Sequence, residues 1–169
     1  KPNSGHGPTC LYLYKYAIDN NTEYIFQTDS DAQTNPGEFW QIWELRNKYD
    51  FIIGSRKNRK DGITRVIVTK VLKIVLRIIF GVWVEDANSP FRMMNTERLR
   101  RYLDIVPPDF FLSNVIISSI IVLKNEKYLW MPISFKPRQG GAPSANFKRI
   151  IKIGFNSVKD FIKIKKQLK

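Results

Sequence analysis

Cysteine and histidine are nearly absent from this sequence, with one of each among 169 residues. The single cysteine, Cys10, excludes an intramolecular disulfide and is typical of a protein kept in a reducing compartment. We expect Cys10 to be a small buried residue rather than a nucleophile, and we interpret the lone His6 as structural. The length indicates one domain, and no internal repeat is visible.

The sequence also lacks a long apolar run without charges. Its most apolar segment, residues 66–84, is interrupted by Lys70, Lys73 and Arg77, which argues against a membrane-spanning helix. These three basic residues recur at helical spacing, so they are predicted to share one face of a helix. A helix that is otherwise aliphatic and basic on one face suits the headgroup region of a membrane.

Acidic residues are scarce, at 15 Asp and Glu against 28 Lys and Arg, which gives a net charge of +13 and a pI near 9.9. This excess favours polyanionic partners, namely nucleotide phosphates, nucleic acid or an anionic membrane surface. The hydrophobic content is 43%, with 13% aromatic residues, which is enough to fill a core and argues against disorder.

Strand and helix patterns alternate along the chain, which predicts an α/β fold. Residues 1–9 are rich in Gly and Pro, and their glycines Gly5 and Gly7 either approach a ligand or form a simple turn. The predicted strands are residues 24–28, 49–53, 82–84 and 128–135. The predicted helices are a first helix with an apolar face over residues 11–18, and then residues 38–48, 64–80, 97–103, 110–123 and 147–168.

Two aspartates one residue apart, Asp29 and Asp31, follow the first predicted strand. A strand that ends this way brings two carboxylates into the crevice at its carboxyl end, where open α/β sheets bind ligands. Carboxylate oxygens suit Mg²⁺ or Mn²⁺, which typically sit between carboxylates and substrate phosphates. The pattern therefore predicts a metal–diphosphate site, although Asp-x-Asp pairs also occur in solvated turns.

The last predicted helix, residues 147–168, is amphipathic. Apolar residues such as Phe161 lie on one side, and basic residues such as Lys159 and Lys163 lie on the other. Two interpretations remain open. The helix either lies on an anionic membrane or packs its apolar side against the domain and leaves its lysines in solvent.

Several short motifs occur in a characteristic order, and together they resemble the inverting family 2 glycosyltransferases with a GT-A fold. The nearest relatives by this resemblance are the polyprenyl-phosphate (dolichol-phosphate) sugar transferases. The motifs are Gly5-His6-Gly7, the stretch from Gln27 to Gln33, Gly54-Ser55-Arg56, Arg65 followed by Thr69-Lys70, Asp86-x-x-Ser89-x-Phe91-Arg92, and Arg138 before Gly140.

The resemblance covers only the later part of the family's catalytic domain. The family's opening strand and its Pro-x-x-Asn-Glu-like turn, which hold the nucleotide base and ribose, do not occur here. We therefore expect a Rossmann-like three-layer sandwich of the nucleotide-diphospho-sugar transferase type, incomplete at its N-terminus. On this expectation residues 1–146 form a partial GT-A catalytic domain, and residues 147–169 form a basic amphipathic C-terminal helix.

The resemblance also implies roles for individual residues. Asp29 would contact the ribose or the metal, Asp31 would hold the Mg²⁺ or Mn²⁺ that bridges the donor diphosphate, and Gln33 would lie near the metal. Phosphates would be neutralised by Arg56, Arg65 and Arg138. Asp86 would be the general base or the electrostatic partner of the acceptor, whereas Ser89 and Arg92 would shape a loop. Gly5 and Gly7 would border the donor.

The implied activity is transfer of a sugar from a nucleotide-diphosphate sugar to a polyprenyl phosphate, at the cytoplasmic face of a membrane. A saccharide hydroxyl is the alternative acceptor, and it would require Asp86 as a base. A haloacid-dehalogenase-like phosphatase fits less well, because that family has Thr or Val where this chain has Gln33. A basic nucleic-acid-binding module leaves the paired aspartates unexplained, so no nucleic acid partner is expected.

Overall fold

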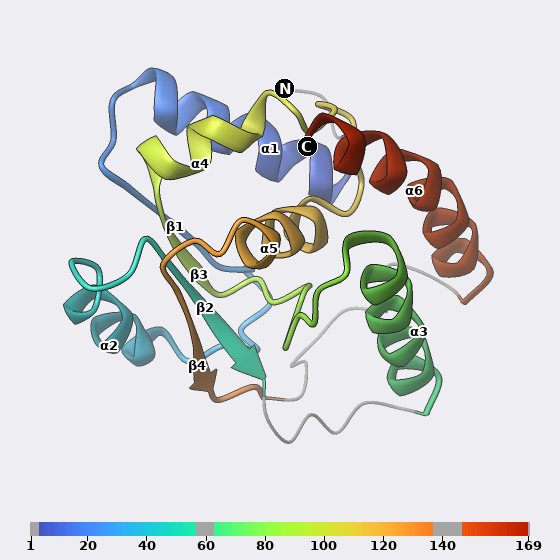
Figure 1. Ribbon diagram of the computed structural model, residues 1–169. Coiled ribbons are helices and arrows are strands. Elements are labelled where there is room, and N and C mark those ends of the chain that lie inside the picture. Colours follow the sequence, from blue (N-terminus) through green and yellow to red (C-terminus); the bar gives the residue numbers. More distant parts are fainter. Residues whose placement is uncertain (1–3, 57–62, 137–146, 169) are drawn as a thin grey trace.

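A four-stranded mixed sheet lies at the centre of the protein, with helices on both of its faces (Figure 1). The computed structural model describes residues 4–56, 63–136 and 147–168. The elements in chain order are α1 (His6–Asp19), β1 (Tyr24–Gln27), the 3-10 turn η1 (Pro36–Glu38), α2 (Phe39–Glu44), β2 (Phe51–Arg56), α3 (Ile63–Phe80), β3 (Arg92–Asn95), α4 (Thr96–Leu103), α5 (Ser113–Leu123), β4 (Tyr128–Ile133) and α6 (Phe147–Gln167).

The sheet has the strand order β1-β3-β2-β4. Strand β3 is antiparallel to both β1 and β2, whereas β2 and β4 are parallel. Strands β1, β2 and β4 therefore run in the same direction, and their carboxyl ends lie at one edge of the sheet. Within the described part of the chain, the outer side of β1 has no partner strand.

The two faces of the sheet bury separate apolar clusters. In β2, the fully buried Phe51 and Ile53 pack in the cluster that includes α1, α3, α5 and α6. Ile52 lies on the opposite face with Ile42 of α2. This alternation follows from the two-residue period of a strand. It gives a layer of helices, the sheet and a second, smaller helical layer, so the predicted α/β class is confirmed.

Helix α5 is the central helix of the larger layer (Figure 1). Every residue from Ser113 to Ile121 is buried, as expected for a helix that is apolar on all sides. The buried Ser118 hydroxyl donates to the carbonyl of Ala87, 3.1 Å away, which satisfies its hydrogen-bonding capacity. This bond also ties α5 to the loop that precedes β3.

Helix α1 starts at His6, so the predicted loop over residues 1–9 is shorter than expected. Gly5 precedes the helix with a φ of 93°, a left-handed conformation that favours glycine. A Cβ atom on Gly7 would lie 2.1 Å from the backbone oxygen of Phe111. Packing against the segment before α5 therefore accounts for a glycine at this position, and the ligand contact expected of Gly7 stays a prediction.

The second half of α6 belongs to the same core as α1 and α5. Phe161 is buried between the rings of Phe80 and Phe110, at centroid distances of 5.8 and 5.6 Å. Ile164 and Leu168 are buried as well. Of the two interpretations of this helix, packing against the domain is confirmed for residues 157–168. The apolar side of this half is therefore not available to a membrane.

Two predictions of secondary structure are wrong. Residues 82–84 form no strand, and the strand β3 at Arg92–Asn95 was not expected. Helix α2 is also shorter than predicted, because residues 45–48 continue as turns. Among the described helices, none combines the length and apolar character needed to cross a bilayer.

Candidate functional site

The candidate site lies where β1, β2 and β4 end, at one edge of the sheet. This is the edge at which open α/β sheets bind ligands. The segment after β1 is joined to the segment after β4: the amide of Lys136 donates to the carbonyl of Gln33 (2.8 Å), and the Gln33 side chain donates to the carbonyl of Lys136 (3.0 Å). Gln33, which was expected near a metal, holds two backbone segments together here.

The two aspartates lie in a tight turn over residues 28–34. One oxygen of Asp31 accepts a hydrogen bond from the amide of Gln33 at 3.2 Å. Ala32, which lies between Asp31 and Gln33, has a φ of 58°. The hydroxyls of Thr28 and Thr34 are 3.0 Å apart across the turn. The backbone of the turn is therefore fixed, and both carboxylates stay partly exposed.

Asp29 contacts the only histidine of the chain. Its Oδ1 atom lies 3.2 Å from Nε2 of His6 in the first turn of α1. Cys10, one turn further along α1, approaches the same ring at 3.7 Å. The hydrogen bond to Asp29 and, to a smaller extent, the one to Cys10 raise the pKa of His6 to about 10. The sequence contains no signal for this contact, because the two residues are far apart and follow no periodic pattern.

Arg56 and Asp86 form a nearly buried ion pair. Nε of Arg56 lies 2.7 Å from Oδ2 of Asp86, its terminal NH2 lies 2.7 Å from Oδ1, and its backbone amide donates to Oδ2 at 3.1 Å. The side chains are 7% and 12% exposed, and the ring of Phe135 lies over the guanidinium. The resemblance assigned Arg56 to a phosphate, and Asp86 to the role of general base or electrostatic partner of the acceptor. Both residues do lie at the site, but they bind each other.

A further carboxylate at this edge was not singled out from the sequence. Glu85 is exposed, and its Oε1 accepts a hydrogen bond from the buried Ser55 hydroxyl at 2.5 Å. Glu85 precedes Asp86, so two consecutive acidic residues contact two consecutive residues of β2. These contacts fix the start of the loop that leads to β3.

The loop between Asp86 and β3 is shaped by Arg92. This arginine is fully buried and donates to the carbonyls of Ser89 (Nε, 3.0 Å) and Asn114 (3.3 Å). Burial lowers the pKa of Arg92 below its usual value. The prediction that Arg92 shapes this loop is confirmed. Two other predicted residues are not placed, because the Arg65 side chain and all of Arg138 lie outside the described residues.

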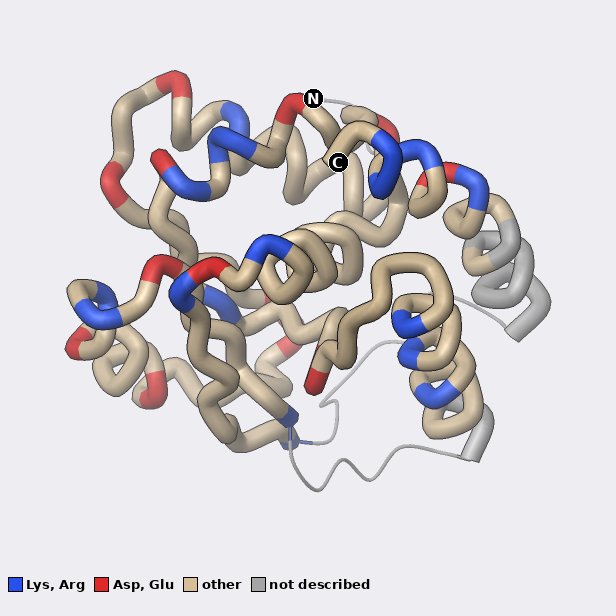
Figure 2. The backbone as a smooth tube through the Cα atoms, viewed as in Figure 1, with Lys and Arg blue, Asp and Glu red and all other residues tan. Residues whose placement is uncertain are grey.

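Helix α3 exposes an apolar surface next to a basic one. Its aliphatic row is more than half exposed and consists of Ile67, Val71, Ile74 and Ile78. Its basic residues follow one side of the helix (Figure 2). Trp83, just beyond the helix, is 61% exposed, and the guanidinium of Arg77 lies 5.9 Å from its ring. We call Ile67, Val71, Ile74, Ile78 and Trp83 the α3 apolar surface.

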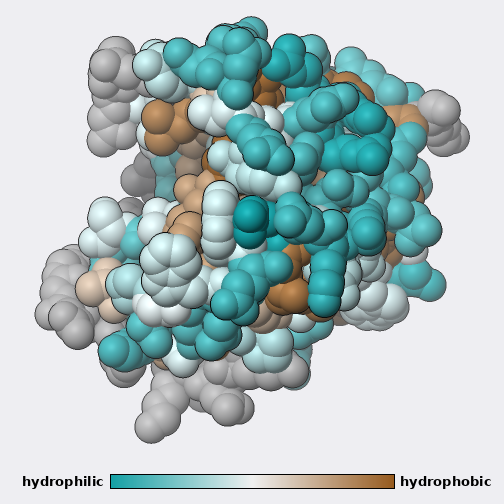
Figure 3. All heavy atoms as spheres, turned by 90° about the vertical axis from the view of Figure 1, so that its left-hand side faces the viewer, coloured by the Kyte–Doolittle hydropathy of each residue, from teal (hydrophilic) through white to brown (hydrophobic). Residues whose placement is uncertain are grey.

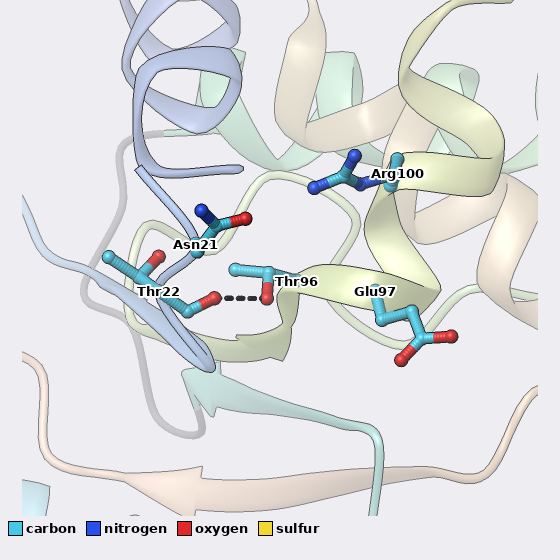
Figure 4. Close-up of a pocket in the computed structure, with 5 residues that line it drawn as sticks. All are labelled: Asn21, Thr22, Thr96, Glu97 and Arg100. Carbon is cyan, nitrogen blue, oxygen red and sulfur yellow. Dashed lines mark hydrogen bonds between the residues drawn. The ribbon is translucent and has the colours of Figure 1, made fainter. Parts of the chain in front are cut away.

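A separate open pocket of about 410 Å³ lies at the opposite edge of the sheet, where β1 begins and β3 ends (Figure 4). Its lining is polar, but Thr96 donates to the carbonyl of Thr22 and Arg100 donates to that of Ile18. The side chains of Thr96 and Arg100 are already hydrogen-bonded to the backbone, so we assign the pocket no ligand. The surrounding face is mainly hydrophilic, with small apolar areas (Figure 3).

Comparison of the chain with protein-family models and with curated proteins finds no match.

Proposed function

We propose that this protein is a glycosyltransferase of the GT-A type that moves a sugar from a nucleotide-diphosphate sugar to a polyprenyl phosphate. The observation that carries this proposal is that Asp29 and Asp31 lie at the same edge of the sheet as Arg56 and Asp86. Residues from three separate segments, those after β1, at the end of β2 and before β3, thus lie at this edge of the sheet. The order of the motifs along the chain supports the same family.

The side chains of the turn fit a divalent cation. Asp29 and Asp31 provide hard oxygen ligands, and Mg²⁺ is commonly bound by one or two carboxylates with substrate phosphates and water completing its shell. No group of three or more acidic, His or Cys side chains among the described residues is arranged to hold a metal ion, and a site that binds Mg²⁺ through two carboxylates does not need one. When bound, Mg²⁺ or Mn²⁺ would neutralise charge on the departing diphosphate.

The Arg56–Asp86 pair favours a phosphate acceptor over a hydroxyl acceptor. A carboxylate that is held by a guanidinium is a poor proton acceptor, because the positive charge stabilises its ionised form. A lipid monophosphate needs no base, since its second pKa is about 6 and it is anionic at neutral pH. Asp86 would then orient Arg56, and the arginine would face the phosphates at this edge.

Replacing Asp86 by asparagine in the full-length protein tests this choice of acceptor. We expect transfer to a short-chain prenyl phosphate to fall by about tenfold or less, because no proton has to be removed. With a saccharide acceptor that relies on Asp86, the loss would reach roughly 10²–10⁴-fold. The measurement is transfer of labelled sugar from a panel of nucleotide sugars with Mn²⁺. Efficient transfer to a soluble oligosaccharide, with none to prenyl phosphate, would contradict the proposed acceptor.

The acceptor implies a membrane partner, and we propose that the α3 apolar surface contacts the cytoplasmic leaflet. Exposed aliphatic side chains beside a basic row are typical of helices that lie in the headgroup region. Each basic residue near an anionic surface contributes about 1 kcal/mol, and the chain carries a net charge of +13. The sequence pointed equally to α6, but the apolar residues Phe161 and Ile164 of that helix are buried.

Changing Ile67, Ile74 and Ile78 together to glutamine is expected to reduce membrane binding at least tenfold. Burial of one large aliphatic side chain contributes about 1.5–3 kcal/mol. Even partial insertion of the three isoleucine side chains therefore contributes substantially to the free energy of membrane binding. The measurement is co-sedimentation with phosphatidylcholine vesicles that contain phosphatidylserine, at low and high salt. The matched control is Leu13→Gln with Tyr16→Gln, which removes exposed apolar side chains from α1. Equal binding by the α3 variant and the control would contradict the proposal.

A further inference from the structure

We infer that His6 is a positioning residue that holds the Asp29 carboxylate in one orientation for the donor site. This inference rests on the proposed function, because it concerns the same pair of aspartates. It also revises the interpretation of His6 from the sequence, where the residue was considered structural.

The contact between His6 and Asp29 is not one that the fold needs. The side chains are 49% and 36% exposed, and exposed ion pairs or hydrogen bonds of this kind contribute little to stability. What the contact does is restrict the side chain of Asp29, since its Oδ1 atom is engaged by Nε2 at 3.2 Å. The other carboxylate oxygen and the remaining lone pair of Oδ1 stay available to a ligand.

His6 is itself held by a contact to its ring and by the packing of its backbone. The Sγ atom of Cys10 lies 3.7 Å from Nε2 of the ring, and the Gln27 amide donates to the same sulfur at 3.7 Å. The backbone of the first turn is fixed by Gly7, which packs directly on the carbonyls of Phe110 and Phe111. A side chain that rests on rigid elements in this way can orient its neighbour.

A hydrogen bond to a ligating carboxylate has a known consequence. Partners of this kind orient the ligand, and their removal typically weakens metal affinity or activity by about 10–100-fold. Cys10 is a third potential ligand beside this pair, but no group of three acidic, His or Cys side chains among the described residues is arranged to hold a metal ion. The geometry therefore fits a supporting role for His6 better than direct ligation.

The test measures Mn²⁺ binding directly, by the loss of the free Mn²⁺ signal in electron paramagnetic resonance, with and without inorganic pyrophosphate. Full-length protein is compared with His6→Phe, His6→Gln and Asp31→Asn. The phenylalanine variant keeps a planar ring without a donor, whereas glutamine places an amide nitrogen near the position of Nε2. We expect His6→Phe to bind Mn²⁺ about 10–100-fold more weakly and His6→Gln to stay close to the wild type.

Thermal unfolding separates positioning from a structural role, because we expect all three variants to melt like the wild type. If His6→Phe binds Mn²⁺ like the wild type while Asp31→Asn does not, the inference about His6 is overturned and the proposed function stands. Equal loss in His6→Phe and His6→Gln, or a large fall in melting temperature in both, also overturns it. If the wild type binds no Mn²⁺ even with pyrophosphate, the proposed function itself fails.

Discussion

Replacement of Asp31 by asparagine is expected to lower sugar transfer by roughly two to three orders of magnitude, the usual effect of removing one preorganised group that stabilises developing charge. The substitution keeps the shape of the side chain and its acceptor oxygen, so the hydrogen bond from the Gln33 amide can persist. The turn should keep its conformation, and only the negative charge is lost. The measurement is the transfer rate of the full-length protein as a function of Mn²⁺ concentration.

Asp109→Asn is the matched control, because it removes the same charge from an exposed turn that is separate from the turn over residues 28–34. We expect it to transfer sugar at the wild-type rate. Circular dichroism and thermal unfolding should not distinguish the two variants from the wild type. Near-normal transfer by Asp31→Asn that a chelator still abolishes would show that the metal is held elsewhere.

The second large effect is expected from glycine-to-alanine substitutions, which should act with opposite sign at two helical positions. Alanine is preferred over glycine inside helices by about 0.5–1 kcal/mol. At Gly154 in α6 the new methyl group has no atom within 4 Å, so we expect stabilisation of that size. At Gly7 the methyl group would lie 2.1 Å from the carbonyl oxygen of Phe111, so overpacking should destabilise the protein by about 1–3 kcal/mol.

Urea unfolding at neutral pH compares the two variants directly, since the change in side chain is identical. The free energy of unfolding should rise for Gly154→Ala and fall for Gly7→Ala, with slopes like that of the wild type. A neutral or stabilising effect of Gly7→Ala would mean that α1 does not pack this closely on the segment before α5. The placement of His6 in the first turn would then be in doubt as well.

Much of the fold was predictable from the sequence because hydrophobic periodicity reports which face is buried. The buried run of β2 and the apolar α5 are examples, and both were predicted close to their observed positions. Strand β3 was missed because Arg92-Met-Met-Asn95 contains no β-branched residue and is held by pairing on both sides. The opposite error occurred at residues 82–84, where Val82 and Val84 pack inward and Trp83 points outward without any strand partner.

The residues of the candidate site were predictable from the sequence, but the contacts between them were not. Asp29, Arg56 and Asp86 could be named because each follows or precedes a recognisable strand or motif. Their actual partners could not, since the pairs Arg56–Asp86 and His6–Asp29 join residues separated by 30 and 23 positions. Such contacts depend on tertiary packing, which no local pattern encodes.

The strand order also has a consequence for the growing chain on the ribosome. Among the described residues, strand β1 pairs only with β3, so Tyr24 can pair only after Asn95 has been synthesised. The pairing of Phe51 in β2 with Tyr128 in β4 likewise requires that Tyr128 has been synthesised. Pairings this far apart are slow to form, because the loop must close before any contact is gained. The apolar residues of β1 and α1 emerge long before their partners exist. We expect efficient production of the protein to depend on chaperones that shield the first half of the chain until β3 and β4 have been synthesised.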